Sequence, residues 1–139
     1  MEARNGVLTE RTHDWRTRFP PSTFRDIRVE GRRVEALVLP DYLLTLCSGH
    51  FPGDPLVPGA TLIALVADLV VGAFEIEFRR LRSIRLRGIA FLRPVRPDSP
   101  LILASHWDHD GAHIVARIHA SVAGKLALRG SVIFEGSEP

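Results

Sequence analysis

The sequence has one cysteine among 139 residues, and it shows no internal repeat and no low-complexity tract. A single cysteine excludes an intramolecular disulfide framework. The first twenty residues mix charges and prolines and hold no apolar run of the signal-peptide kind, so we expect a cytoplasmic protein. A chain of this length, 45% hydrophobic and 24% charged, fits one globular domain with one core.

The longest apolar stretch, residues 56–74, does not predict a membrane span. Pro58, Thr61, Asp68 and Gly72 interrupt it, and an Asp in the middle of a span costs roughly 2.5–3.5 kcal/mol on insertion scales. We therefore interpret this stretch as a buried helix of a globular protein.

The formal net charge is only +2, but seven of the eighteen basic residues fall between positions 79 and 96. Such a cluster is either the solvated face of a strand or a docking surface for an acidic partner or a phosphate group. The candidate docking residues are Arg85, Arg87 and Arg93. We expect no nucleic-acid partner, because no aromatic residues interleave with the arginines and no recognition-helix or zinc-finger pattern is present.

Hydrophobic patterning predicts one helix and an antiparallel sheet, which together make an α+β domain. The helix should begin near Pro58, run to about Phe74 and be buried, because it is apolar on all sides. Strands are predicted at residues 33–39, 84–92, 101–107, 113–122 and 126–134, with hairpin turns at 108–111 and 123–125. Residues 42–47 favour no element.

Alternation along residues 84–92 places Ile84 and Leu86 on one face of the strand, and Arg85, Arg87 and Phe91 on the other. Ahead of the first predicted strand, residues 1–23 are rich in charge and proline. We expect these residues to form an N-terminal arm, pinned by Trp15 and Phe19, with a single domain over residues 24–139.

A histidine stands between glycines and prolines just before the predicted helix. Residues 49–59 read Gly-His-Phe-Pro-Gly-Asp-Pro-Leu-Val-Pro-Gly. A lone histidine is more often structural, but this setting favours a role in a site for His50. The run resembles the active-site signature of the hot-dog-fold 3-hydroxyacyl-[acyl carrier protein] dehydratases. Residues 89–98 and 122–127 are similar to a later strand and turn and to the final hairpin of that family.

The resemblance, which covers residues 33–134, implies a hot-dog fold in which an antiparallel sheet wraps around one long central apolar helix. It also implies a homodimer, or a larger oligomer of dimers, with active sites between subunits. The substrate would be a 3-hydroxyacyl thioester on acyl carrier protein or coenzyme A, in fatty acid or polyketide biosynthesis. The substrate is carried on phosphopantetheine, and no metal or redox cofactor is implied.

The resemblance also implies roles for individual residues. His50 would remove the C2 proton, and the N–H of Gly59 would hydrogen-bond the thioester carbonyl. Phe51, Pro58 and Ala64 would belong to the substrate-binding surface. Elimination of water needs one group to take a proton and another to give one.

The sequence departs from the family at the second of these groups. The family's catalytic Glu or Asp lies fourteen residues after the histidine, where this chain has Ala64. Asp68, the one ionisable residue between positions 60 and 74, lies one helical turn further on and leans back toward Ala64. We therefore name Asp68 as the candidate acid. The alternative is a structural role, in which Asp68 caps a polar network or contacts the partner subunit.

Two further activities stay open. A hot-dog thioesterase would keep the groove and the Gly59 donor, with water attacking the thioester carbonyl. A non-catalytic acyl-binding or partner subunit would explain Ala64. Cys47 is interpreted as a buried, inert thiol rather than a nucleophile. The histidines at 106, 109 and 113 should splay over different faces of a hairpin, so we expect no zinc site.

Overall fold

The computed structural model describes residues 3–4, 7–9, 19–47, 53–74 and 81–136. The described part contains one sheet and two α-helices. The strands are β1 (Ala3–Arg4), β2 (Val7–Thr9), β3 (Arg25–Glu30), β4 (Arg33–Val38), β5 (Leu81–Phe91), β6 (Leu101–Asp110), β7 (His113–Val122) and β8 (Lys125–Gly136). The helices are α1 (Pro40–Leu46) and α2 (Gly59–Phe74), and a single 3₁₀ turn, η3, covers Pro21–Thr23.

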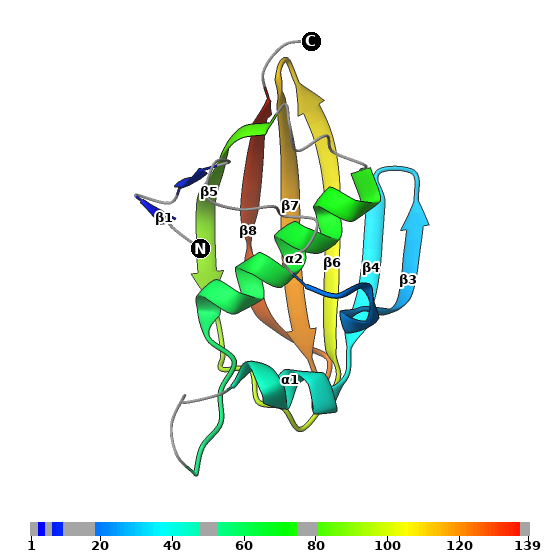
Figure 1. Cartoon of the computed structure of the whole chain (residues 1–139), viewed down its shortest axis with the longest axis vertical. Helices are drawn as coiled ribbons and strands as arrows, with labels where there is room; N and C mark the ends of the chain where they lie inside the picture. Colours follow the sequence, from blue (N-terminus) through cyan, green and yellow to red (C-terminus); the bar gives the residue numbers. More distant parts are fainter. Residues whose placement is uncertain (1–2, 5–6, 10–18, 48–52, 75–80, 137–139) are drawn as a thin grey trace.

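The eight strands pair in the order β1-β2-β5-β8-β7-β6-β4-β3, and every neighbouring pair is antiparallel. Figure 1 shows α2 running diagonally across one face of this sheet, with α1 near one end of the long strands. Both helices lie between β4 and β5 in the chain, and α2 crosses the inner face of the long strands that follow it in the sequence. The predicted α+β class and the sheet around a central helix are confirmed.

The core lies between α2 and the inner face of the sheet. Nine residues of α2 are buried: Leu62, Ile63, Ala64, Leu65, Val66, Ala67, Leu69, Val70 and Val71. They meet alternate residues of the long strands, such as Leu101, Leu103, Ile118 and Phe134, which are fully or almost fully buried. The apolar helix therefore packs on the buried face that period-two alternation creates on the strands, as the sequence predicted.

A proline stands at the start of α1 and another immediately precedes α2. Pro40 occupies the first turn of α1, and the carbonyl oxygen of Pro58 accepts hydrogen bonds from the N–H groups of Thr61 and Leu62 at 3.0 and 3.1 Å. A proline costs little at this place, because its missing N–H would lack a helical partner anyway. The start and end predicted for α2 are confirmed to within one residue, whereas α1 falls on residues that the pattern left unassigned.

The predicted β5 alternation is wrong beyond Arg87. The pairing of β5 with β8 shifts register between Arg87 and Ala90, at Gly88 with φ 63°. Before this β-bulge Leu86 faces Val132 on the inner side, and after it Phe91 faces the buried Leu128. A bulge adds one residue to its strand and so exchanges the faces of everything that follows. Phe91 therefore shares the inner face with Ile84 and Leu86, not the outer face with the arginines.

The N-terminal region holds two further differences from expectation. Strand β3 was not predicted, although Ile27 and Val29 alternate with charged residues there; all six of its residues are exposed, so the strand adds nothing to the core. Strand β2 pairs with the edge of β5, so part of the expected arm extends the sheet. Phe19 packs against the core as predicted, while Trp15 lies outside the described residues. The boundary at residue 23 stays a prediction.

Candidate active site

The start of α2 supplies a hydrogen-bond donor. Gly59 is the first residue of α2, and the first N–H groups of a helix have no acceptor within it. The helix dipole adds partial positive charge at this end. The site can therefore bind a carbonyl oxygen and stabilise negative charge that develops on it.

A groove opens beside this donor. It has a volume of about 550 Å³, within the roughly 300–1,000 Å³ of small-molecule sites. Its lining is largely apolar and comes from the residues before and at the start of α2 and from the end of β5 with the segment after it. The lining residues are Leu56, Val57, Pro58, Gly59, Leu62, Phe91, Leu92, Arg93, Pro94 and Val95. Such a surface suits an acyl chain better than a polar ligand.

Two contacts fasten the segment that precedes α2 to the segment that follows β5. The Nε atom of Arg96 donates to Oδ1 of Asp54 at 3.1 Å, and the N–H of Val57 donates to the carbonyl of Val95 at 2.9 Å. Sequence reasoning missed the Arg96–Asp54 pair. The two residues lie 42 positions apart, and nothing in either local pattern links them.

The predicted site residues fall into two groups. His50 and Phe51 lie outside the described residues, so their positions stay predictions. Pro58 and Gly59 both line the groove, and their role in binding substrate stays a prediction. Ala64 is buried, with 1% of its surface exposed. It lies on α2 about 7.5 Å along the axis from Gly59.

Asp68 lies four residues beyond Ala64, or about 6 Å further along the helix axis. It is half-buried, in contrast to its neighbours Ala67 and Leu69, which are buried. Asp68 also takes part in an interaction within the structure. The carboxylate therefore lies on the one side of α2 that the core leaves partly open, near the place of the family's missing acid.

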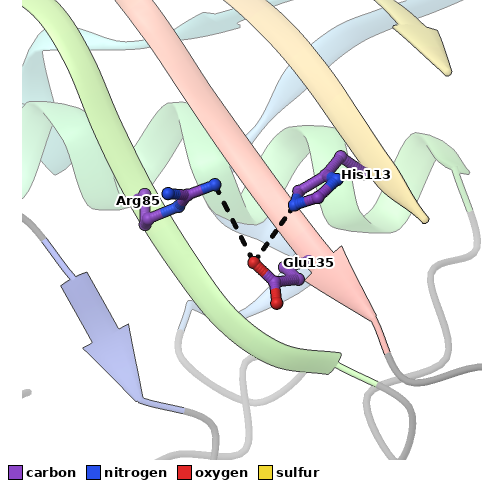
Figure 2. Close-up of polar contacts among 3 residues, drawn as sticks. All are labelled: Arg85, His113 and Glu135. Atoms are coloured by element: carbon purple, nitrogen blue, oxygen red, sulfur yellow. Dashed lines mark hydrogen bonds and ion pairs between the residues drawn. The ribbon is translucent and has the colours of Figure 1, made fainter. Parts of the chain in front are cut away.

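The three candidate docking arginines do not share one surface. Arg85 and Arg87 precede the bulge, lie on the outer face of β5 and are exposed. Figure 2 shows Arg85 and His113 both reaching Glu135, at 3.8 Å from the Arg85 guanidinium and 3.1 Å from His113 Nε2. Arg93 lines the groove instead, and its Nε donates to the carbonyl of Leu126 at 2.9 Å.

Cys47 is buried, and its thiol donates to the carbonyl of Leu43 at 3.3 Å. Burial raises the pKa of the Cys47 thiol, which disfavours the reactive thiolate. His106 stacks on His119 with ring centroids 6.3 Å apart, and His113 contacts Glu135. Among the residues that the structure describes, no group of three or more His, Cys, Asp or Glu side chains is placed to hold a metal ion.

The fold and the groove agree with a match to a known family. Residues 26–128 match the ApeI-like family, whose members are described as ApeI dehydratase. This chain belongs to that family. It is also 32% identical over 123 residues to the 3-hydroxyacyl-[acyl-carrier-protein] dehydratase FabZ of Thermus thermophilus, a match that covers 82% of this chain and 76% of the relative.

A second relative is FabZ of Thermomicrobium roseum, which is 30% identical over 96 residues. That match covers 66% of this chain and 64% of the relative, so the chain spans less than two thirds of that enzyme. The match to FabZ of a Wolbachia strain from Culex pipiens covers only 45% of the relative, at 33% identity.

Solved structures show the same hot-dog fold. The dehydratase heterocomplex ApeI:P from Xenorhabdus doucetiae aligns with a TM-score of 0.63 at 20% identity, over 81% of this chain and 96% of that chain. A mutant thioesterase from Pseudomonas aeruginosa aligns with a TM-score of 0.53 at 17% identity, over 81% and 80%. The described part of the chain contains no helix long and apolar enough to cross a membrane.

Proposed function

We propose that this protein is a 3-hydroxyacyl thioester dehydratase of the cytoplasm, working on chains carried by acyl carrier protein or coenzyme A in fatty acid or polyketide-type biosynthesis. The observation that carries the proposal is the start of α2. There the N–H of Gly59 meets a largely apolar groove of about 550 Å³, directly after the histidine motif. An acyl chain fits the groove, and the thioester oxygen fits the donor.

The reaction then needs two proton transfers and cleavage of the C3–O bond, whose electron pair leaves with the oxygen. His50 takes the proton from C2 of the substrate, and the electrons of that C–H bond form the C2–C3 double bond. The hydroxyl on C3 accepts a proton and leaves as water. The helix start at Gly59 stabilises the negative charge that gathers on the carbonyl oxygen during the transfer. No electron leaves the substrate, so the chemistry calls for no redox cofactor.

We assign the proton on the leaving hydroxyl to Asp68. Ala64 has no proton to give, and Asp68 is the one ionisable residue of α2. Asp68 is half-buried, on the side of α2 where a second subunit would pack in the proposed dimer. In a homodimer, the Asp68 of a second copy would complete the site that His50 begins.

A second candidate is a subunit that borrows its acid from a different hot-dog protein. The alanine at position 64 favours this reading, because the family's acid position here offers no polar group. The ApeI:P heterocomplex of Xenorhabdus doucetiae is a dehydratase assembled from two kinds of chain. A homodimer and a heterodimer differ in one measurable respect, namely whether the purified chain works alone.

Mass spectrometry of acyl thioesters tests both candidates. The purified protein is incubated with 3-hydroxyacyl chains on pantetheine and on acyl carrier protein. Loss of water that falls about 10²–10⁴-fold in Asp68→Asn, but not in the control Asp41→Asn on α1, supports Asp68 as the acid. Water loss unaffected by Asp68→Asn would contradict that role, and His50→Ala should abolish turnover in either case.

The other outcomes identify the alternatives. Release of free acid and thiol would mean a thioesterase. A bound but unchanged acyl chain would mean a non-catalytic subunit, and Ala64→Glu or an added acid-bearing hot-dog subunit should then start dehydration. Carrier protein crosslinking to groove variants at Arg93, with Arg87 on the outer face as control, would locate the docking surface.

A further inference from the structure

The wall of the groove contains an aromatic ring that is large, apolar and poorly covered. Phe91 is 53% exposed, although it lies on the inner face of β5. Burial of an apolar ring is favourable, and about half of the Phe91 surface does not gain this benefit. The Phe91 ring is therefore in contact with the protein on one side and exposed on the other.

The side that holds the ring is Gly59. A Cβ atom added to Gly59 would lie 2.7 Å from both Cε1 and Cζ of Phe91 and 3.3 Å from Cδ1. The ring therefore fills the space that any other side chain at the start of α2 would need. It lies next to the first N–H groups of the helix, where the proposed thioester carbonyl binds.

The backbone around the ring is fixed. The N–H of Leu92 donates to the carbonyl of Ala127 at 2.8 Å, Phe91 pairs with Leu128 in the sheet, and Arg93 bonds the carbonyl of Leu126. Hydrogen bonds thus continue from β5 past its last residue. Rotation of the Phe91 side chain changes the shape of this wall without breaking any of these hydrogen bonds.

We propose that the ring of Phe91 is a side-chain gate at Gly59, and that its rotation sets how bulky a group the site accepts near the reacting carbons. The proposal rests on the proposed function, since it takes the groove as the acyl site. With the ring against Gly59 the space beside the helix start is narrow. Rotation toward solvent widens that space.

A binding experiment tests the gate without any turnover. All seven phenylalanines are replaced by 4-fluorophenylalanine, and the Phe91 resonance is assigned by its loss in Phe91→Leu. Pantetheine carrying butyryl or 3-phenylpropionyl through an amide, which cannot react, is then titrated in. We expect the Phe91 resonance to move, and to move further with the bulkier analogue. An unmoved resonance at saturation, or no binding of either analogue, overturns the gate.

A kinetic experiment tests the selectivity. The ratio of kcat/KM for 3-hydroxy-3-phenylpropionyl over 3-hydroxybutyryl pantetheine is measured in wild type, Phe91→Ala and Phe91→Leu. We expect the ratio to rise at least about tenfold in Phe91→Ala, with Phe91→Leu between the two. The control Leu44→Ala removes an equally exposed apolar side chain, 58% exposed on α1 and away from the groove, and should leave the ratio unchanged.

The two experiments separate the gate from the dehydratase. Turnover with an unchanged ratio in both Phe91 variants would overturn the gate and leave the dehydratase standing. Absence of turnover together with a bulk-dependent shift of the Phe91 resonance would support the gate in a groove with a different activity. A double-mutant cycle tests the contact between Phe91 and Gly59. Gly59→Ala should weaken analogue binding in wild type and leave it unchanged in Phe91→Ala. An equal loss of affinity in both backgrounds would contradict the contact.

Discussion

Replacement of Gly130 by alanine tests the bulge that places Phe91 in the groove. Gly130 lies on β8 opposite the bulge and has φ 155°, in a region that favours glycine. A Cβ there would lie 2.5 Å from Cδ1 and 2.9 Å from Cα of Ile89, and 3.1 Å from the carbonyl oxygen of Gly88. The clash involves backbone atoms as well as a side chain, so rotation of Ile89 alone cannot relieve it.

The cost has two parts. A non-glycine residue in such a conformation costs about 1–3 kcal/mol, and inserting a methyl group into a closely packed place costs a further 1–3 kcal/mol or so. We therefore expect Gly130→Ala to lower the free energy of unfolding by about 2–6 kcal/mol, a large share of the roughly 5–15 kcal/mol that a domain has. Urea denaturation at constant m-value measures this loss.

Gly72→Ala is the matched control. Gly72 is an exposed residue of α2 with no atom within 4 Å of an added Cβ, and alanine is the better helix former by up to about 1 kcal/mol. The same substitution should thus stabilise at one site and destabilise at the other. If Gly130→Ala unfolds within about 1 kcal/mol of wild type, the argument for a rigid bulge at Gly88 is refuted.

Three further predictions concern the segment before α2, the thiol of Cys47 and the stacked pair His106–His119. Arg96→Gln should change the free energy of unfolding by less than about 1 kcal/mol, because the pair of Arg96 with Asp54 is exposed. The same change should lower kcat/KM about tenfold or more, because it releases the segment before α2 that Arg96 holds. A loss of stability without a loss of kcat/KM would contradict this. Native Cys47 should react with a thiol reagent at pH 8 far more slowly than the unfolded chain, because burial raises its pKa, and equal rates would refute the burial argument. Burial, and then the positive charge of His106, lower the pKa of His119. The unfolded state therefore binds more protons, and the free energy of unfolding falls as pH drops below about 6.5. Urea unfolding of His119→Gln should show a weaker fall with pH, and the same pH dependence as wild type would contradict the prediction.

The sequence alone predicted the features that depend on neighbouring residues. The start of α2 follows from Pro58, whose ring fixes φ and whose missing N–H is harmless in a first turn. The turn between β7 and β8 follows from Gly124, which has φ 74°, since glycine readily adopts the positive φ that such a two-residue hairpin turn requires. Burial of α2 follows from its apolar composition on every side. The histidine motif likewise pointed to the acyl-thioester family before any geometry was known.

Tertiary structure decided what depends on residues far apart in the chain. The face taken by Phe91 depends on a bulge that forms only against Gly130 of another strand, and so strict alternation failed there. The pair Arg96–Asp54 joins segments 42 residues apart. Strand β3, exposed throughout, exists because β4 offers a pairing edge. Turns and helix starts depend on steric preferences of consecutive residues and can be predicted from them. Contacts between distant segments form only when the sheet packs over the helix.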